Sequence, residues 1–132
     1  MVPQPALSLV DLYKSFGATP VLKGISFEIG EGEIIAILGP SGCGKSTLLQ
    51  VIAGLEKSDA GEILWKGETL SATPPHLRGF GLMFQDYALF PHMNVYQNVA
   101  FGLRMSGSGK DKINTHVKQM LDLVGLPGFE ER

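Results

Sequence analysis

The alternation of apolar and polar residues predicts several strands in the first two thirds of the chain. Residues 25–29 (Ile-Ser-Phe-Glu-Ile) alternate, which is the period of a strand with one buried face. Residues 34–38 (Ile-Ile-Ala-Ile-Leu) are apolar at every position and predict a strand covered on both faces, as in a parallel α/β sheet. A Gly-Glu-Gly turn at residues 30–32 separates the two. Further strands are predicted over residues 7–12, 61–67 and 80–84.

Apolar residues at helical spacing predict three helices. The first covers residues 48–55. The second, over residues 95–105, follows Asn94, which together with Gln97 resembles a capping box. The third, over residues 110–124, carries the clearest apolar stripe in the chain. Strands followed by helices in this order predict an α/β fold.

A glycine-rich segment lies between the fully apolar strand and the first predicted helix. Gly39-x4-Gly44-Lys45-Ser46 matches the P-loop, or Walker A, pattern. Its glycines let backbone N–H groups approach phosphate oxygens closely, and the helix that follows directs its positive end at the same place. Lys45 is expected to reach the β- and γ-phosphates, Ser46 to ligate Mg²⁺ and Thr47 to help hold the α-phosphate. The predicted phosphate-binding residues are Gly39, Pro40, Ser41, Gly42, Cys43, Gly44, Lys45, Ser46 and Thr47.

The composition is rich in glycine and argues against two classes of protein, nucleic-acid binders that rely on bulk charge and disordered chains. Glycine accounts for 17 of the 132 residues, whereas average usage of about 7% would give roughly nine. The net charge of −2 gives no support for a nucleic-acid binder that relies on bulk charge. The hydrophobic share of 44% argues against disorder. The single cysteine, Cys43, cannot form an internal disulfide, and no base motif accompanies it, so we interpret it as chemically inert.

No targeting segment is apparent in the sequence. Residues 1–10 lack both the basic and the continuous apolar regions of a secretory signal. The longest apolar run, residues 34–38, is far shorter than a membrane span. A soluble cytoplasmic protein is therefore the expectation.

The surroundings of the loop resemble the nucleotide-binding subunit of ABC transporters. The resemblance covers nearly the whole chain, and its last segment especially resembles importer ATPases for sugars, polyamines, ferric iron, thiamine or phosphonates. The matching segments are residues 14–17 (Lys-Ser-Phe-Gly), 21–27 (Val-Leu-Lys-Gly-Ile-Ser-Phe), 30–33 (Gly-Glu-Gly-Glu), 39–47, 52–55 (Ile-Ala-Gly-Leu) and 83–92 (Met-Phe-Gln-Asp-Tyr-Ala-Leu-Phe-Pro-His).

The resemblance implies an α/β P-loop NTPase core of the ABC ATPase type, truncated, with an antiparallel β subdomain and the start of a helical subdomain. The β subdomain, P-loop and Q-loop would occupy residues 1–92, and the helical subdomain would begin in residues 93–132. The implied function is that of an ATP-binding subunit that couples ATP binding and hydrolysis to solute import. Such subunits form homodimers and lie on the cytoplasmic face of the cell membrane.

The resemblance also implies roles for residues outside the P-loop. Phe16 takes the place of the aromatic residue that stacks on adenine. Gln85 takes the place of the Q-loop glutamine, which reaches Mg²⁺ and the attacking water. Lys45 and Gln85 are thus the catalytic candidates, and Ser46 and Gln85 the metal ligands, with ATP and Mg²⁺ as cofactors. The segment from Tyr87 to His92 is expected to face a transmembrane permease partner.

Several motifs of that family are absent from the 132 residues: the signature motif, the Walker B strand with its Mg²⁺-binding aspartate, the catalytic glutamate, the D-loop and the switch histidine. Because phosphoryl transfer depends on positioning and on stabilising charge, we expect the chain alone to bind ATP–Mg²⁺ weakly, if at all, and to hydrolyse it negligibly. A non-hydrolysing fragment that binds nucleotide or a partner is therefore the alternative to an importer ATPase. A GTPase or kinase is a weaker option, because the chain has no Asn-Lys-x-Asp guanine motif.

Overall fold

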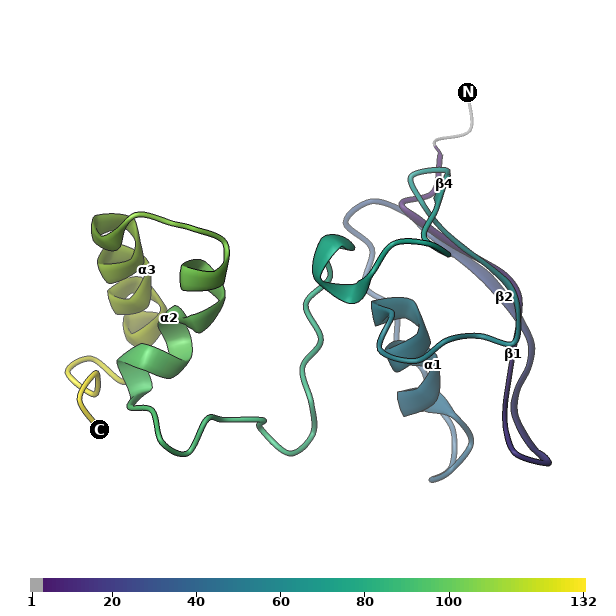
Figure 1. The fold of residues 1–132 in the computed structure, drawn as a ribbon, viewed down its shortest axis with the longest axis horizontal. Coiled ribbons are helices and arrows are strands. Elements are labelled where there is room, and N and C mark those ends of the chain that lie inside the picture. Colours follow the sequence, from purple (N-terminus) through teal and green to yellow (C-terminus); the bar gives the residue numbers. More distant parts are fainter. Residues whose placement is uncertain (1–3) are drawn as a thin grey trace. The chain divides into compact units, whose positions relative to one another are not determined.

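The computed structural model describes residues 4–132 and divides the chain into two compact units. The first unit ends at Met83, and the second comprises Phe84–Arg132. Figure 1 shows a sheet with helical segments beside it in the first unit and a pair of helices in the second. The two units are described separately below.

The first unit is built on an antiparallel sheet with the strand order β2-β1-β3-β4. Strands β1 (Leu7–Phe16) and β2 (Thr19–Ile29) form a long hairpin, which extends well beyond the predicted strands over residues 7–12 and 25–29. Strand β3 (Ala60–Trp65) confirms the strand predicted over residues 61–67, and β4 (Glu68–Thr69) is a short addition at the edge. A single 3₁₀ turn, η1 (Pro75–Leu77), follows the sheet.

A bulge in β1 sets which of its side chains enter the core. Leu9 and Leu12 are both buried, although strict alternation would place them on opposite faces. The pairing shifts between them, and Asp11 adopts a left-handed conformation with φ 45°. The bulged backbone passes so close to Gly61 that a Cβ there would clash with the Asp11 carbonyl group. The extra residue thus redirects the rest of β1 and brings Leu12 inward.

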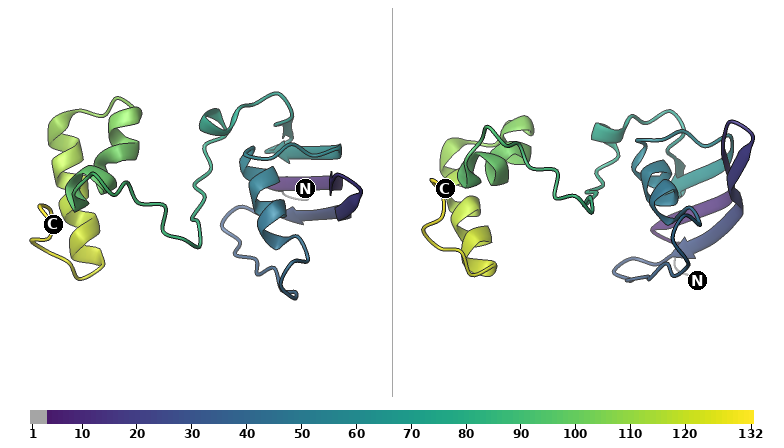
Figure 2. Two further views of the ribbon diagram at one scale, coloured as in Figure 1. Left: turned by 60° about the horizontal axis from the view of Figure 1, so that its bottom comes forward. Right: turned by 90° about the horizontal axis from the view of Figure 1, so that it is seen from below.

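Helix α1 (Lys45–Ala53) covers one face of the sheet (Figure 2). Leu48 and Val51 point from the helix into the core and meet side chains of the strands. The buried cluster comprises Leu7, Leu9, Leu12, Leu22, Leu48, Val51, Ile63 and Leu70. The helix predicted over residues 48–55 is confirmed, with its start three residues earlier because the helix begins inside the loop motif.

The C-terminal end of α1 is closed by a glycine and an arginine. Gly54 adopts a left-handed conformation with φ 82°, which brings its N–H to the carbonyl oxygens of the last helical turn. The guanidinium of Arg78 donates to the carbonyl oxygens of Val51 at 3.2 Å and Ile52 at 2.8 Å. It also donates to carbonyl oxygens of the loop that precedes it, those of Thr73 and Leu70. Arg78 therefore connects the helix end to the segment after the sheet.

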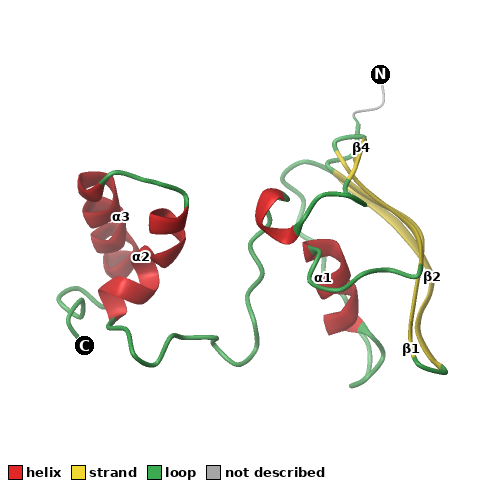
Figure 3. Ribbon diagram, in the orientation of Figure 1, coloured by secondary structure: helices red, strands yellow, loops and turns green. Residues whose placement is uncertain are grey.

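Two predicted strands are wrong in this structure. Residues 34–38 and 80–84 have no regular secondary structure, and Figure 3 draws the stretch between β2 and α1 as loop. Ile34 is 97% exposed, Leu38 89% and Met83 94%. An apolar strand covered on both faces needs neighbouring strands that pair with its backbone. Within residues 4–132, no strand pairs with either segment.

The second unit contains α2 (Val95–Met105) and α3 (Lys110–Leu123), which pack their apolar faces together. The capping box is confirmed: Asn94 Oδ1 accepts from the Gln97 N–H at 2.8 Å, and Gln97 Oε1 accepts from the Asn94 N–H at 3.0 Å. The buried side chains that join the helices are Ala100, Ile113, Val117 and Leu121. The helices predicted over residues 95–105 and 110–124 are thereby confirmed, although α3 ends one residue earlier than predicted. Among the described residues, no helix has the length and apolar character needed to cross a bilayer.

We predict that Arg78→Met lowers the free energy of unfolding of the first unit by roughly 2 kcal/mol, because carbonyl groups lose a charged donor. Urea titration followed by the fluorescence of Trp65, the single tryptophan, measures this change. Lys23→Met is the control, since Lys23 lies exposed on β2. Equal unfolding midpoints for the two variants would contradict the role given to Arg78.

Candidate nucleotide site

The loop motif ends where α1 begins. Gly44 is the residue that precedes the helix and adopts φ 97°, a conformation that favours glycine. A Cβ at this position would lie 2.8 Å from Val21 Cγ1 and 3.2 Å from the Val21 carbonyl oxygen. The absent side chain therefore lets the loop pack directly against β2. The strand expected immediately before the loop is replaced here by irregular backbone over residues 34–38.

Lys45 bends back over its own loop. Its ammonium donates to the carbonyl oxygens of Gly39 and Pro40, both at 2.8 Å, and lies 3.6 Å from Cys43 Sγ. The positive charge is thus held against the backbone of Gly39 and Pro40, the first two residues of the loop. Cys43 contributes a weak contact to this arrangement and is itself exposed.

The first amides of α1 are available to a ligand. No side chain caps the helix, and within residues 4–132 no acceptor is found for the N–H groups of Lys45, Ser46 and Thr47. By contrast, α2 begins with a complete capping box. Unpaired amides at a helix start, together with the Lys45 ammonium, suit an anion with several oxygens. The residues of the loop therefore fit a polyphosphate.

Phe16 ends β1 and lies 49% exposed. It pairs with Thr19 across the hairpin, and Val21, which contacts the Gly44 position, follows two residues further along β2. That separation corresponds to about 7 Å along a strand. The structure thus brings the predicted adenine-stacking residue and the start of α1 to the same end of the hairpin.

Gln85 and the segment from Tyr87 to His92 belong to the second unit. Gln85 is exposed in a turn, and its predicted contact with Mg²⁺ stays a prediction. Asn98 of α2 fixes the following segment, because its side chain accepts from the Phe90 N–H at 2.9 Å and donates to the Phe90 carbonyl at 3.2 Å. Tyr87 remains 87% exposed and Leu89 68%. These two side chains are therefore available to a partner.

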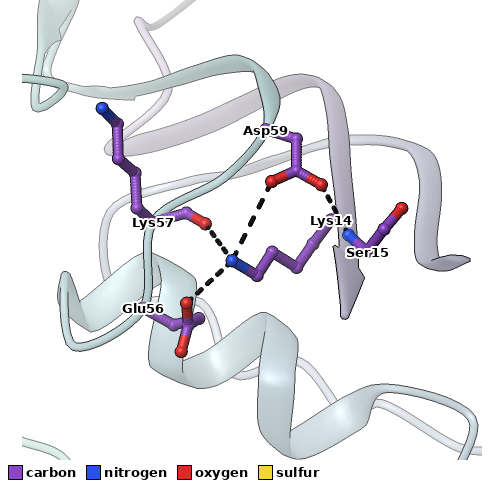
Figure 4. A network of polar contacts seen from close by, with 5 residues as sticks. All are labelled: Lys14, Ser15, Glu56, Lys57 and Asp59. Carbon is purple, nitrogen blue, oxygen red and sulfur yellow. Dashed lines mark hydrogen bonds and ion pairs between the residues drawn. The ribbon is translucent and has the colours of Figure 1, made fainter. Parts of the chain in front are cut away.

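A charged cluster was not anticipated from the sequence. Lys14 lies in β1 with its side chain only 11% exposed, and its Nζ is 2.7 Å from Glu56 Oε1 and 3.9 Å from Asp59 Oδ1 (Figure 4). Nζ also donates to the Lys57 carbonyl oxygen at 2.8 Å, and Asp59 Oδ2 accepts from the Ser15 N–H at 2.6 Å. The hydrogen bond from Lys14, opposed by partial desolvation, lowers the pKa of Glu56 from its usual 4.5. We call Lys14, Glu56, Lys57 and Asp59 the Lys14 clamp. No local pattern in the sequence could have found it, because the carboxylate partners lie more than 40 residues away from Lys14.

An apolar cleft of about 450 Å³ lies elsewhere in the first unit. Its walls include Leu49 and Ile52 of α1, Trp65 of β3, and Phe80. No residue of the loop from Gly39 to Thr47 lines it. The candidate site is therefore the exposed loop at the start of α1, not this cleft.

The sheet, the loop and the helix that follows it define a protein of the P-loop NTPase class. Comparison identifies the family: the family model described as ABC transporter matches residues 22–132, so the chain belongs to the ABC transporter family. The fold agrees with a solved structure of CbiO1 from Clostridium perfringens, part of the ABC transporter complex CbiONQ. The TM-score is 0.80 at 33% identity, covering 98% of this chain and 54% of that one.

Curated relatives carry names of import and transport ATP-binding proteins. A spermidine/putrescine import ATP-binding protein PotA from Clostridium novyi is 44% identical over 126 residues. An alpha-glucoside transport ATP-binding protein AglK from Rhizobium meliloti is 46% identical, and an Fe(3+) ions import ATP-binding protein FbpC from Streptomyces avermitilis is 48% identical. Each match covers 96% of this chain. The chain spans only 35–36% of the length of these relatives.

We predict that Gly44→Ala destabilises the first unit by about 1–3 kcal/mol, because a Cβ there is strained by φ and meets Val21. Thermal unfolding monitored by Trp65 fluorescence measures the effect. Gly42→Ala is the matched control: Gly42 also has a left-handed φ, of 80°, but no atom lies within 4 Å of its added Cβ. If both variants lost the same stability, the contact with Val21 would not be the cause.

We also predict that the Lys14 clamp weakens in acid. Because the pKa of Glu56 is lowered on folding, its contribution is present above its usual value of 4.5 and is lost as pH falls through the depressed pKa. In urea titrations from pH 7 to pH 3, Glu56→Gln should therefore show a smaller acid-induced loss than the native chain. Glu62→Gln, at an exposed position of β3, should follow the native curve. A Glu56→Gln profile parallel to the native one would contradict this assignment.

Proposed function

We propose that this chain binds ATP with Mg²⁺ through the loop from Gly39 to Thr47. The single observation that carries the proposal is the start of α1, where unpaired amides of Lys45, Ser46 and Thr47 adjoin the Lys45 ammonium. Such an arrangement favours a polyanion over a neutral ligand. The match of residues 22–132 to the ABC transporter family supports a nucleotide as that polyanion.

Each loop residue has a distinct proposed role. The amides of Ser41, Gly42 and residues 44–47 donate to phosphate oxygens. Pro40 and Cys43 shape the turn, in which the Cys43 N–H donates to the Pro40 carbonyl at 3.4 Å. Lys45 exchanges its carbonyl partners at Gly39 and Pro40 for the β- and γ-phosphates. Ser46 supplies a hydroxyl ligand to Mg²⁺, which neutralises phosphate charge when bound. Phe16 stacks on adenine, and its half-exposed ring at the end of β1 supports this role.

In a protein of the full length of these relatives, these elements would serve an ATPase that powers solute import. The names printed for the relatives, which are import and transport ATP-binding proteins, support this proposal. Gln85 would contact Mg²⁺ and the attacking water. The exposed segment from Tyr87 to His92 would bind a membrane permease on the cytoplasmic face, and two subunits would pair. Residues 1–92 would then form the nucleotide-binding part, with the β subdomain, the P-loop and the Q-loop. Residues 93–132 would form the start of a helical subdomain.

We predict that Lys45→Ala weakens ATP–Mg²⁺ binding at least tenfold, because the loop loses the point charge that faces the phosphates. Isothermal titration calorimetry with the 132-residue chain measures this loss. Lys23→Ala, exposed on β2, should bind as the native chain does. Equal affinities of Lys45→Ala and the native chain would refute the proposed site.

A further inference from the structure

The residues just before Phe16 are attached to the segment that follows α1. The Asp59 N–H donates to the Tyr13 carbonyl at 2.8 Å, and Asp59 Oδ2 accepts from the Ser15 N–H at 2.6 Å. Between them, the Lys14 ammonium contacts Glu56 and the Lys57 carbonyl. Three consecutive residues of β1 are therefore fixed immediately before the candidate adenine-stacking residue, as Figure 4 shows for two of them.

The Lys14 side chain is held firmly in this cluster. It is 11% exposed, whereas its carboxylate partners Glu56 and Asp59 are 33% and 49% exposed. A lysine ammonium has three donors, and the Lys14 clamp offers it two carboxylates and a carbonyl oxygen. A lysine side chain, which is usually mobile, is thus restricted to one place.

The same ammonium lies over the ring of Phe16. The distance from Lys14 Nζ to the ring centroid is 5.0 Å, within the range of a cation–π interaction. The pairing with β2 shifts between Lys14 and Ser15, so this proximity is given by the measured distance and not by strand alternation. The cation therefore lies over one face of the Phe16 ring, while Phe16 as a whole remains 49% exposed.

We infer that Lys14 is a positioning residue for nucleotide binding, which orients the Phe16 ring for the adenine base through the Lys14 clamp. This inference rests on the proposed function. A buried ammonium is a costly way to anchor a strand, since an apolar side chain of similar volume is often as stabilising as a buried ion pair. The end of β1 that carries Lys14 and Phe16 is already paired with β2, while its pairing with β3 ends at Tyr13. What the ammonium adds is a charge that fixes an aromatic ring.

The test compares ATP with inorganic tripolyphosphate, which can occupy the P-loop but has no base. Lys14→Met keeps the aliphatic stem and removes the charge. We expect it to weaken ATP–Mg²⁺ binding by roughly three- to tenfold, the size of a lost cation–π contact and ring position. Tripolyphosphate affinity should change by less than about twofold, because its contacts lie within the loop. Isothermal titration calorimetry on the 132-residue chain gives both affinities.

A double-mutant cycle with Phe16→Ala separates positioning from a general effect on the fold. If Lys14 acts through the ring, Lys14→Met should have no further effect on ATP affinity once the ring is absent. Lys66→Met is the matched control, since Lys66 also pairs with a carboxylate, Glu31 at 3.2 Å, and lies 5.9 Å from an aromatic ring centroid, that of Trp65. The control should leave both affinities unchanged.

Three results would overturn the inference while leaving the proposed function intact. Lys14→Met could leave ATP affinity unchanged, weaken tripolyphosphate equally, or weaken ATP as strongly in the Phe16→Ala background as in the native one. A folded native chain that binds neither ATP nor tripolyphosphate would instead overturn the proposed function and, with it, this inference.

Discussion

The packing of α1 on the antiparallel sheet is the interaction on which the rest of the first unit depends. Leu48 and Val51 join the helix to a core of strand residues that includes Leu22. Burial of each such side chain stabilises the fold by about 1.5–3 kcal/mol. The same packing places Gly44 against Val21. The position of the first helical amides, and so of the candidate site, is therefore fixed by the hydrophobic core.

Two cationic side chains, Arg78 and Lys14, bind backbone carbonyl groups at or just after the C-terminal end of α1. Arg78 donates to the carbonyl oxygens of Val51 and Ile52, and Lys14 donates to the carbonyl oxygen of Lys57 shortly after the helix. The C-terminal end of a helix carries partial negative charge, which the Arg78 guanidinium meets directly. Arg78 connects this end to the segment after the sheet, whereas Lys14 connects it to β1. The strand end that carries Phe16 is thus coupled to the helix whose start forms the loop.

Local sequence signals predicted the local structure well. Asn94 and Gln97 form the capping box that their spacing indicated, and Gly44 with Lys45 begins the helix after the loop. The signals failed where structure depends on distant neighbours. Residues 34–38 have the composition of a buried strand, but strand formation also needs a partner to accept and donate backbone hydrogen bonds. The role of Lys14 depends on Glu56 and Asp59, more than 40 residues away in sequence, so no local pattern could reveal it.

The unpaired segment before the loop clarifies how the loop itself is held. Ile37 packs against the core, while Ile34 and Leu38 on either side of it are 97% and 89% exposed. Gly39 therefore follows a backbone that Ile37 attaches to the core but that, within residues 4–132, pairs with no strand. The other side of the loop is fixed by Gly44 against Val21, and the Lys45 ammonium joins the two sides through the carbonyl oxygens of Gly39 and Pro40. In this structure the lysine that would meet the phosphates also closes the loop. Its transfer to a ligand must therefore be offset by other contacts, which the N–H groups at the start of α1 can donate to phosphate oxygens.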